Sequence, residues 1–254
     1  MKKHVLINYP GRLGNQLFLF REALLEHQAN IIYAPYFEKY GYKPYFQFSE
    51  KLCDKTYYEK NQDKFISIPW STDYYKKNRD PQEKNTSLFK LIQPYETTVD
   101  EIIQTFRAKQ KHPIIALHYR AGDYRWWTSS TGKNYFVPLK DYFSKISLFC
   151  EQNTIQNHQI IVFSDEKIKP SNQYLLSREF TQGHSILDLY LMAQCDYIFA
   201  THSTFSHWAN YIGENQLIIC SDGFTPNKNL AHSPSALLRR SLSKLKRIIN
   251  PSEV

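Results

Sequence analysis

Side chains that can bind an anion follow an apolar segment near the middle of the chain. Residues 114–117 are all apolar, and His118, Arg120 and Asp123 come directly after them. On an extended backbone His118 and Arg120 point to the same face, because alternate residues do. An arginine guanidinium suits a phosphate group, since it donates two parallel charge-assisted hydrogen bonds. The structural alternative is an ion pair between Arg120 and Asp123 on a surface turn.

Two later apolar segments end in the same way. The run 160–163 is followed by Ser164, Asp165 and Glu166, and the run 197–200 by the residues His202, Ser203, Thr204, Phe205 and Ser206. Strand-like runs that alternate with helical patterns predict a parallel sheet wound on both faces. The carboxyl ends of parallel strands share one edge, where open α/β sheets bind ligands. We therefore expect the three polar clusters to converge on one site.

The surrounding patterns predict the elements that must position these side chains. Expected strands cover 4–9, 31–34, 114–118, 160–163, 197–200 and 216–220, and expected helices cover 17–25, 97–109 and 139–150. A further helix is expected to start at a Ser185 cap with Asp188 at its third position, and another to run from about 203 to Tyr211 and end at Gly213 as a C′ residue. The segment 35–94 has no clear period and is expected to be irregular, or alternatively to form a lid or acceptor surface.

The first expected strand leads into a glycine turn. Gly11 and Gly14 lie in this turn, which does not match the three-glycine dinucleotide fingerprint. The helix that follows still offers free backbone N–H groups and a positive dipole end. The turn is therefore a second place where an anion could bind.

Composition restricts the class of protein. The 254 residues suit one large domain or two small ones, and the net charge of +8 implies attraction to polyanions, anionic lipid or phosphorylated substrates. No nucleic-acid-binding motif is present, so a nucleic-acid partner is not expected. Four scattered cysteines are expected to be free thiols in a reducing compartment, and no segment resembles a signal peptide or membrane span. A cytoplasmic location is expected.

The carboxyl-terminal segment is amphipathic and basic. Leucines and isoleucines share one helical face over 235–249, and arginines and lysines cover much of the remainder. Such a helix can lie on an anionic membrane surface, which would make the protein peripheral on the inner membrane face. An ordinary helix docked on the protein body is the alternative, and the pattern does not decide between them.

Four motifs resemble glycosyltransferase family 11, the α-1,2-fucosyltransferases. They are Gly-Arg-Leu-Gly-Asn-Gln at 11–16, His-Tyr-Arg-Ala-Gly-Asp-Tyr at 118–124, Phe-Ser-Asp-Glu at 163–166, and a fourth motif comprising Asp188, Leu191-Met192, Cys195, Ser203-Thr204-Phe205-Ser206 and Trp208. The family is related to protein O-fucosyltransferases and α-1,6-fucosyltransferases. The resemblance implies an α/β, GT-B-like fold with two Rossmann-like domains. These would be a reduced acceptor-side domain at 1–110 and a GDP-sugar-binding domain at 111–234, with the basic tail at 235–254.

The resemblance also implies an activity. It is inverting, metal-independent transfer of L-fucose from GDP-β-L-fucose to a hydroxyl, O2 of galactose, on an oligosaccharide or glycolipid acceptor. No cofactor or metal is expected, and the chain contains no Asp-x-Asp triplet. The alternatives are transfer of another GDP-linked sugar, or a catalytically silent module that binds a glycan or nucleotide.

Roles for individual residues follow from the resemblance. Arg120 would stabilise the departing diphosphate, Asn15 would face the reaction centre, and either Asp123 or His118 would assist deprotonation of the acceptor. The expected donor-binding residues are Arg12, Gly14, Gln16, Gly122, Tyr124, Ser164, Asp165, Glu166, His202, Ser203, Thr204, Phe205 and Ser206, with Asp165 and Glu166 near the guanine or ribose.

The chain departs from the family pattern at three positions. Ala121 stands where a second arginine is usual, so one phosphate contact would have to come from elsewhere, for example from Arg12 or Arg125. His202 and His207 replace an asparagine and a tryptophan of the last motif. These changes affect the expected donor sugar and linkage more than the fold.

Overall fold

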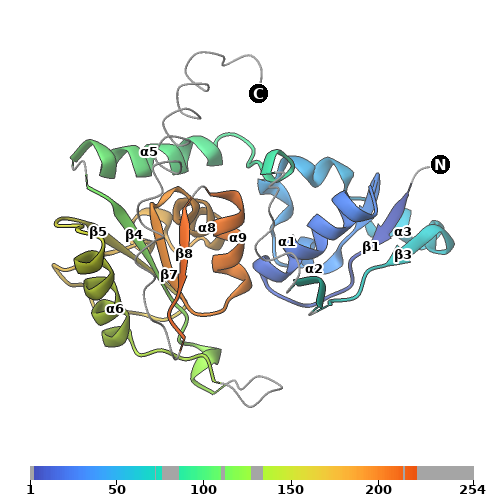
Figure 1. The fold of residues 1–254 in the computed structure, drawn as a ribbon. Coiled ribbons are helices and arrows are strands. Elements are labelled where there is room, and N and C mark those ends of the chain that lie inside the picture. Colours follow the sequence, from blue (N-terminus) through green and yellow to red (C-terminus); the bar gives the residue numbers. More distant parts are fainter. Residues whose placement is uncertain are drawn as a thin grey trace.

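The computed structural model describes residues 3–71, 73–75, 86–109, 112–126, 134–213 and 215–221. Two parallel β-sheets form the body, one of three strands and one of five, and helices connect them (Figure 1). The tail 235–254 lies outside the described residues, so its expected membrane contact remains a prediction.

The smaller sheet is built from the first part of the chain. Its strands are β1 (His4–Leu6), β2 (Ile31–Tyr33) and β3 (Phe65–Ser67), in the order β2-β1-β3. Helix α1 (Leu13–Arg21) follows β1 and continues as a π-helical turn, Glu22–Glu26. The remaining short elements are α2 (Pro35–Lys39), α3 (Lys55–Lys60) and 3₁₀ turns at Lys43–Tyr45, Gln47–Lys51, Gln62–Lys64 and Thr86–Phe89. The segment expected to be irregular thus contains an edge strand, β3, of three residues, of which Ile66 and Ser67 are exposed.

The larger sheet carries the polar clusters. Its strands are β4 (Ile114–Tyr119), β5 (Gln159–Ser164), β6 (Leu175–Leu176), β7 (Tyr197–Ala200) and β8 (Gln216–Ile219), in the order β6-β5-β4-β7-β8. The helices are α5 (Tyr95–Lys109), α6 (Leu139–Gln152), α7 (Arg178–Thr181), α8 (Ser185–Gln194) and α9 (Thr204–Ile212), with a 3₁₀ turn at Asp123–Arg125. β4 and β7 pair directly, so the ends of β5, β4 and β7 are neighbours at one edge.

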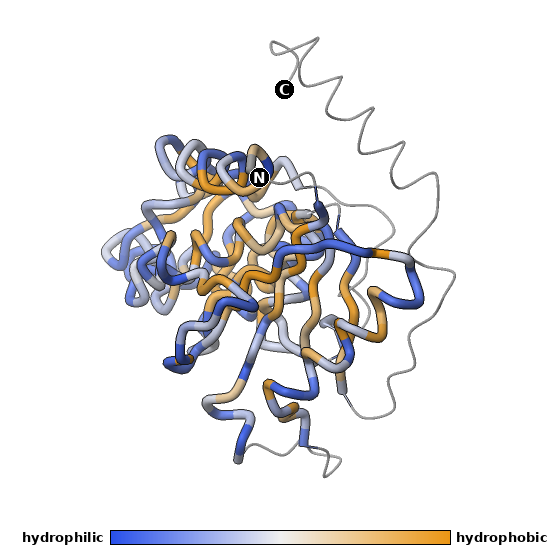
Figure 2. Tube along the Cα trace, turned by 90° about the vertical axis from the view of Figure 1, so that its left-hand side faces the viewer, coloured by the Kyte–Doolittle hydropathy of each residue, from blue (hydrophilic) through white to orange (hydrophobic). Residues whose placement is uncertain are grey.

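The strands of the body are largely hydrophobic in sequence (Figure 2). Residues from both faces of the larger sheet belong to buried cores, as expected for parallel strands between helices. Along β4, Ile115 and Leu117 pack into the core that contains α6. Ile114 and Ala116 pack into the core that contains residues of α5, α8 and α9. Because side chains alternate along a strand, His118 continues the second set and faces the helices that meet the smaller sheet.

Helices α1 and α9 join the two parts of the chain. Phe18 of α1 meets Trp208 of α9 with the ring centroids 5.0 Å apart, inside a core to which both parts contribute. The first turns of the two helices approach so closely at Gly14 that a Cβ there would lie 2.7 Å from the backbone nitrogen of Phe205. Only glycine permits this contact, which brings the two helix N-termini together.

Two expectations about helix ends are wrong. Helix α8 begins at Ser185 itself, its N-cap is His184 without a side-chain cap, and Asp188 instead accepts a hydrogen bond from Thr181 Oγ1 at 2.7 Å. The Asp188 carboxylate therefore binds the hydroxyl of Thr181, which precedes the helix, and does not form the expected cap with Ser185. Gly213 ends α9 with φ −88°, so it is not a left-handed C′ residue. Glycine is needed there because a Cβ would lie 2.3 Å from the carbonyl oxygen of Ala193.

The expected α/β class with two parallel sheets and a reduced amino-terminal part is confirmed. The exact domain boundary near residue 110 remains a prediction. Cys53, Cys150, Cys195 and Cys220 are free thiols, and all except Cys53 are buried. Within the described residues, no helix combines the length and apolar character needed to cross a membrane.

Candidate functional site

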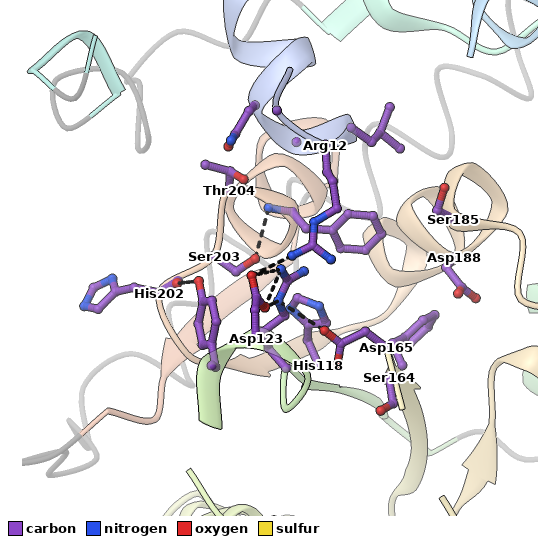
Figure 3. Close-up of a pocket in the computed structure, with 18 of the residues that line it drawn as sticks. Arg12, His118, Asp123, Ser164, Asp165, Ser185, Asp188, His202, Ser203 and Thr204 are labelled. Atoms are coloured by element: carbon purple, nitrogen blue, oxygen red, sulfur yellow. Dashed lines mark hydrogen bonds and ion pairs between the residues drawn. The ribbon is translucent and has the colours of Figure 1, made fainter. Parts of the chain in front are cut away.

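A cavity of about 840 Å³ opens where the expected clusters meet. It is lined by the β1–α1 turn and by residues that follow β4, β5 and β7, with α8 along one side (Figure 3). The expected site residues that line it are Arg12, Gly14, Asn15, His118, Arg120, Asp123, Tyr124, Ser164, Asp165, His202, Ser203, Thr204 and Phe205. The convergence expected from the sheet edge is therefore present, and the turn before α1 joins it.

Asp123 lies between two arginines from distant parts of the chain. Its Oδ2 accepts a hydrogen bond from Arg12 Nη2 at 2.8 Å, and its Oδ1 accepts one from Arg120 Nη2 at 2.8 Å (Figure 3). Arg120 Nε also lies 3.3 Å from Asp165 Oδ2, and only 14% of the Arg120 side chain is exposed. The ion pair between Arg120 and Asp123 is therefore present, and Arg120 also lines the cavity, so the two interpretations of this arginine do not exclude each other. The cluster presents two guanidinium groups to the same cavity.

Two helix N-termini reach this cluster. Helix α1 begins at Leu13, and its N-cap, Arg12, makes no side-chain cap, although the N–H of Leu13 donates to the hydroxyl of Tyr42. The positive end of the helix dipole points toward the cluster. Helix α9 begins at Thr204, and the Ser203 hydroxyl accepts from the N–H of Phe205 at 3.3 Å. Both termini and both arginines place N–H donors at one spot, although Asp123 and Asp165 balance the two guanidinium charges. A diphosphate can bind there by replacing Asp123 as the partner of the two arginines.

The ring of Tyr124 packs against the guanidinium group of Arg120. Its hydroxyl donates to the carbonyl oxygen of His202 at 2.6 Å, and the guanidinium of Arg120 lies 5.1 Å from its ring centroid. Burial raises the pKa of Tyr124 to about 12, so the hydroxyl is protonated at neutral pH. The ring therefore fixes the position of Arg120 without contributing a charge.

His118 is neutral in the folded protein. It is 5% exposed, and its ring lies 5.3 Å from the ring of Phe205. Burial lowers its pKa to about 4, although the nearby charge of Asp165 acts in the opposite direction. At neutral pH this imidazole is available as an uncharged hydrogen-bonding group at the cavity wall.

The depressed pKa of His118 makes stability depend on pH. Between pH 6.5 and about 4 the unfolded chain binds a proton that the folded chain does not, so this contribution is complete above pH 6.5 and is lost as the pH falls. The loss should be on the order of 3 kcal/mol. Urea unfolding of the wild type and of His118→Gln at pH 7 and 4.5 measures it. The free energy of unfolding should fall more steeply in the wild type, and equal falls would contradict a neutral buried His118.

Four expected site residues do not line the cavity. Gln16 is buried and donates from Nε2 to the carbonyl oxygens of Tyr9 and Gly11, which shapes the turn. The N–H of Gly122 donates to Asp165 Oδ1 at 3.2 Å. Glu166 forms an ion pair with Arg125 at 2.8 Å, and the buried Ser206 donates to the carbonyl oxygen of Ser203. These contacts support the loops around the cavity.

Several lining residues were not expected from the sequence. Tyr9, Trp70 and Tyr75 are aromatic, and Tyr42, Gly183, Ser185 and Asp188 also line the cavity. Trp70 follows β3, which the pattern did not predict, so nothing placed it beside Tyr9. Asp188 was expected to lie at a helix cap and belongs to the fourth family motif, but it was not assigned to the site. Burial raises the pKa of its carboxyl, and hydroxyl groups of Thr181 and Ser177 partly oppose this.

Possible metal ligands are not grouped in the described part of the chain. There, no set of three or more histidine, cysteine, aspartate or glutamate side chains is placed to hold a metal ion. The expectation of a metal-independent reaction remains a prediction.

Comparisons with known proteins add a family and a fold. A sequence model described as glycosyl transferase family 11 matches residues 43–232. A mutant of FUT1 from Arabidopsis thaliana in complex with GDP aligns with a TM-score of 0.50 at 13% identity, covering 92% of this chain and 73% of that one. The fucosyltransferase NodZ from Bradyrhizobium aligns with a TM-score of 0.49 at 11% identity, covering 85% and 95%. No curated protein sequence matches.

Proposed function

The chain belongs to glycosyl transferase family 11, and we propose that it transfers L-fucose from GDP-β-L-fucose to O2 of a galactose residue on a glycan acceptor, with inversion and without a metal. One observation carries the proposal. Arg12, Arg120 and the N-termini of α1 and α9 meet at a single cavity that is large enough for a nucleotide sugar.

The cationic cluster suits the departing diphosphate. As the bond to the sugar breaks, negative charge grows on the β-phosphate oxygens, and preorganised donors lower the free energy of that transition state. Arg120 is held by Asp165 and the ring of Tyr124, contacts that it can keep when the diphosphate replaces Asp123. Arg12 supplies the second cation that Ala121 does not provide, whereas Arg125 is engaged by Glu166 outside the cavity. The FUT1 mutant from Arabidopsis thaliana, which shares the fold, has a structure in complex with GDP, and this supports a guanine nucleotide as the carrier of the donor sugar.

The two expected candidates for the base differ in character. His118 is neutral with a pKa of about 4, so it is a weak base and suits a hydrogen-bonding role. Asp123 is the carboxylate nearest to both arginines and lines the cavity. We assign it as the base: once the diphosphate takes over the two guanidinium groups, this carboxylate is released beside the reacting carbon and can accept the acceptor's proton.

We expect the guanine base to lie on the side of the cavity that helix α8 forms. The Watson–Crick edge of guanine carries N–H donors, which a carboxylate can accept. Asp165 already accepts from the N–H groups of Ala121 and Gly122, and Glu166 lies outside the cavity. Asp188 lines the cavity beside Ser185 and is held by a hydroxyl rather than by a cation. We therefore assign the guanine edge to Asp188 rather than to Glu166.

Product analysis tests the proposal. The protein is incubated with lactose and either GDP-fucose or GDP-mannose, and the product linkage is determined by NMR. GDP-fucose should yield lactose fucosylated at O2 of galactose with α configuration. Transfer from GDP-mannose alone would favour the alternative donor. Binding of GDP without transfer to any galactoside would favour the silent nucleotide-binding module.

A further inference from the structure

Three aromatic rings form one wall of the cavity, which we call the aromatic wall: Tyr9, Trp70 and Tyr75. The rings of Tyr9 and Trp70 are nearly parallel, 17° apart, with centroids separated by 5.4 Å. Trp70 and Tyr75 are 5.9 Å apart at 30°. All three side chains are partly buried, so each ring keeps some surface toward the cavity.

The backbone explains why these rings meet. β1 and β3 pair in parallel with Leu6 opposite Ser67, and Tyr9 and Trp70 each come three residues after those partners. The pairing continues beyond the strands, because the N–H of Ile68 donates to the carbonyl oxygen of Leu6 at 2.9 Å. The aromatic wall therefore lies at the carboxyl ends of the strands of the smaller sheet. The cationic cluster lies at the carboxyl ends of the strands of the larger sheet.

The turn after Tyr9 holds its ring in place. A Cβ at Gly11 would lie 2.3 Å from Tyr9 Cε1, so glycine is required for the ring to occupy this position. Gln16 donates to the carbonyl oxygens of Tyr9 and Gly11, and the Tyr40 hydroxyl donates to that of Pro10 at 2.9 Å. A turn fixed at three successive residues is preorganised to present a binding surface.

The wall differs chemically from the rest of the cavity. Its three side chains carry no charge, whereas the charged residues that line the cavity are Arg12, Arg120, Asp123, Asp165 and Asp188. A diphosphate needs the charged groups on those residues, and the edge of a nucleobase needs their hydrogen-bonding groups, whereas the face of a base can also stack on an aromatic ring. An uncharged pyranose presents C–H groups on its apolar face, which aromatic rings contact favourably, and its hydroxyls can meet the tyrosine and indole polar atoms.

Distance along the chain places the wall near the reaction. Tyr9 precedes Arg12 by three residues, so their Cα atoms lie within about 11 Å of each other even if the turn is fully extended. The transferred sugar is bonded directly to the diphosphate. This separation is short enough for an acceptor on the wall to reach the sugar carbon that it attacks.

From these observations, and building on the proposed function, we infer that Tyr9 and Trp70 form the acceptor subsite, on which a neutral hexopyranose of the acceptor stacks. We assign Trp70 as the specificity-determining residue, because its indole is the largest of the three rings and contacts both of the others. The alternative occupant, the guanine base, is distinguished by the test below.

The test compares Trp70→Ala and Trp70→Phe with the wild type, using lactose as the acceptor. Trp70→Ala should raise KM for lactose about tenfold or more, while the Kd for GDP measured by calorimetry changes less than about twofold. Trp70→Phe should restore much of the loss. Tyr57→Ala is the matched control, because Tyr57 is 38% exposed and does not line the cavity.

A second measurement does not depend on turnover. Saturation-transfer NMR with lactose should show contact from the protein to the galactose C–H groups in the wild type and lose it in Trp70→Ala. An unchanged lactose KM, or a loss of GDP affinity of the same size, would overturn the acceptor subsite. A wild type that binds lactose through Trp70 but binds no GDP would contradict the proposed donor and retain the subsite.

Discussion

Arg120→Ala is expected to lower kcat for fucosyl transfer by about 10²–10³-fold, the effect of removing one preorganised charge-stabilising donor. The affinity for GDP should fall by about 10–100-fold, because charge-assisted hydrogen bonds to the diphosphate are lost. The side chain is 14% exposed and is held by Asp165 and the ring of Tyr124, so its geometry is set before the donor arrives. Initial rates with GDP-fucose and calorimetric titration with GDP measure the two effects.

Two further variants separate charge from geometry. Arg120→Lys keeps the positive charge but cannot make two parallel hydrogen bonds, so it should recover only part of the rate. Arg125→Ala is the matched control, because this arginine is ion-paired with Glu166 and does not line the cavity. Thermal unfolding of each variant verifies the fold. Near-wild-type turnover of a folded Arg120→Ala protein would refute the diphosphate role.

Asp123→Asn is expected to separate catalysis from binding. If the carboxylate accepts the acceptor's proton, kcat should fall by about 10²–10⁴-fold. The affinity for GDP should stay the same or increase, because an amide competes less well than a carboxylate for Arg12 and Arg120. Initial rates and GDP titrations of the same preparation provide both values.

A neighbouring carboxylate serves as the comparison for that variant. Asp165→Asn alters a residue that accepts from the N–H groups of Ala121 and Gly122 and contacts Arg120, so it should weaken GDP binding and lower kcat together. Undiminished kcat in Asp123→Asn would show that the base lies elsewhere. Weaker GDP binding in that variant would show that Asp123 positions the arginines.

The larger sheet and its polar edge could be predicted because its strands are buried on both faces. β4, β5 and β7 read as continuous apolar runs, and the polar residues after them mark the shared edge. The family motifs additionally predicted that the turn before α1 belongs to the site. The pairing of Arg12 with Asp123 spans 111 residues, and no local pattern encodes it. Its presence depends on the contact between α1 and α9 at Gly14.

The aromatic wall and the role of Asp188 could not be predicted. β3 is an edge strand of only three residues, so the short apolar stretch 65–68 was too brief to predict its pairing with β1, and hence the position of Trp70. Ser185 and Asp188 have the spacing of a capping pair, but the hydroxyl of Thr181 competes for the carboxylate. Helix α8 therefore starts without that cap, and Asp188 remains at the cavity.

Titration of the wild-type protein with GDP in the presence of EDTA tests the central claim most directly, namely that arginines and helix N-termini hold the diphosphate without a metal. We predict binding in the micromolar range, unchanged by EDTA and weakened by added salt, since the contacts are electrostatic. No binding up to millimolar GDP, or binding that appears only after a divalent metal is added, would contradict the account.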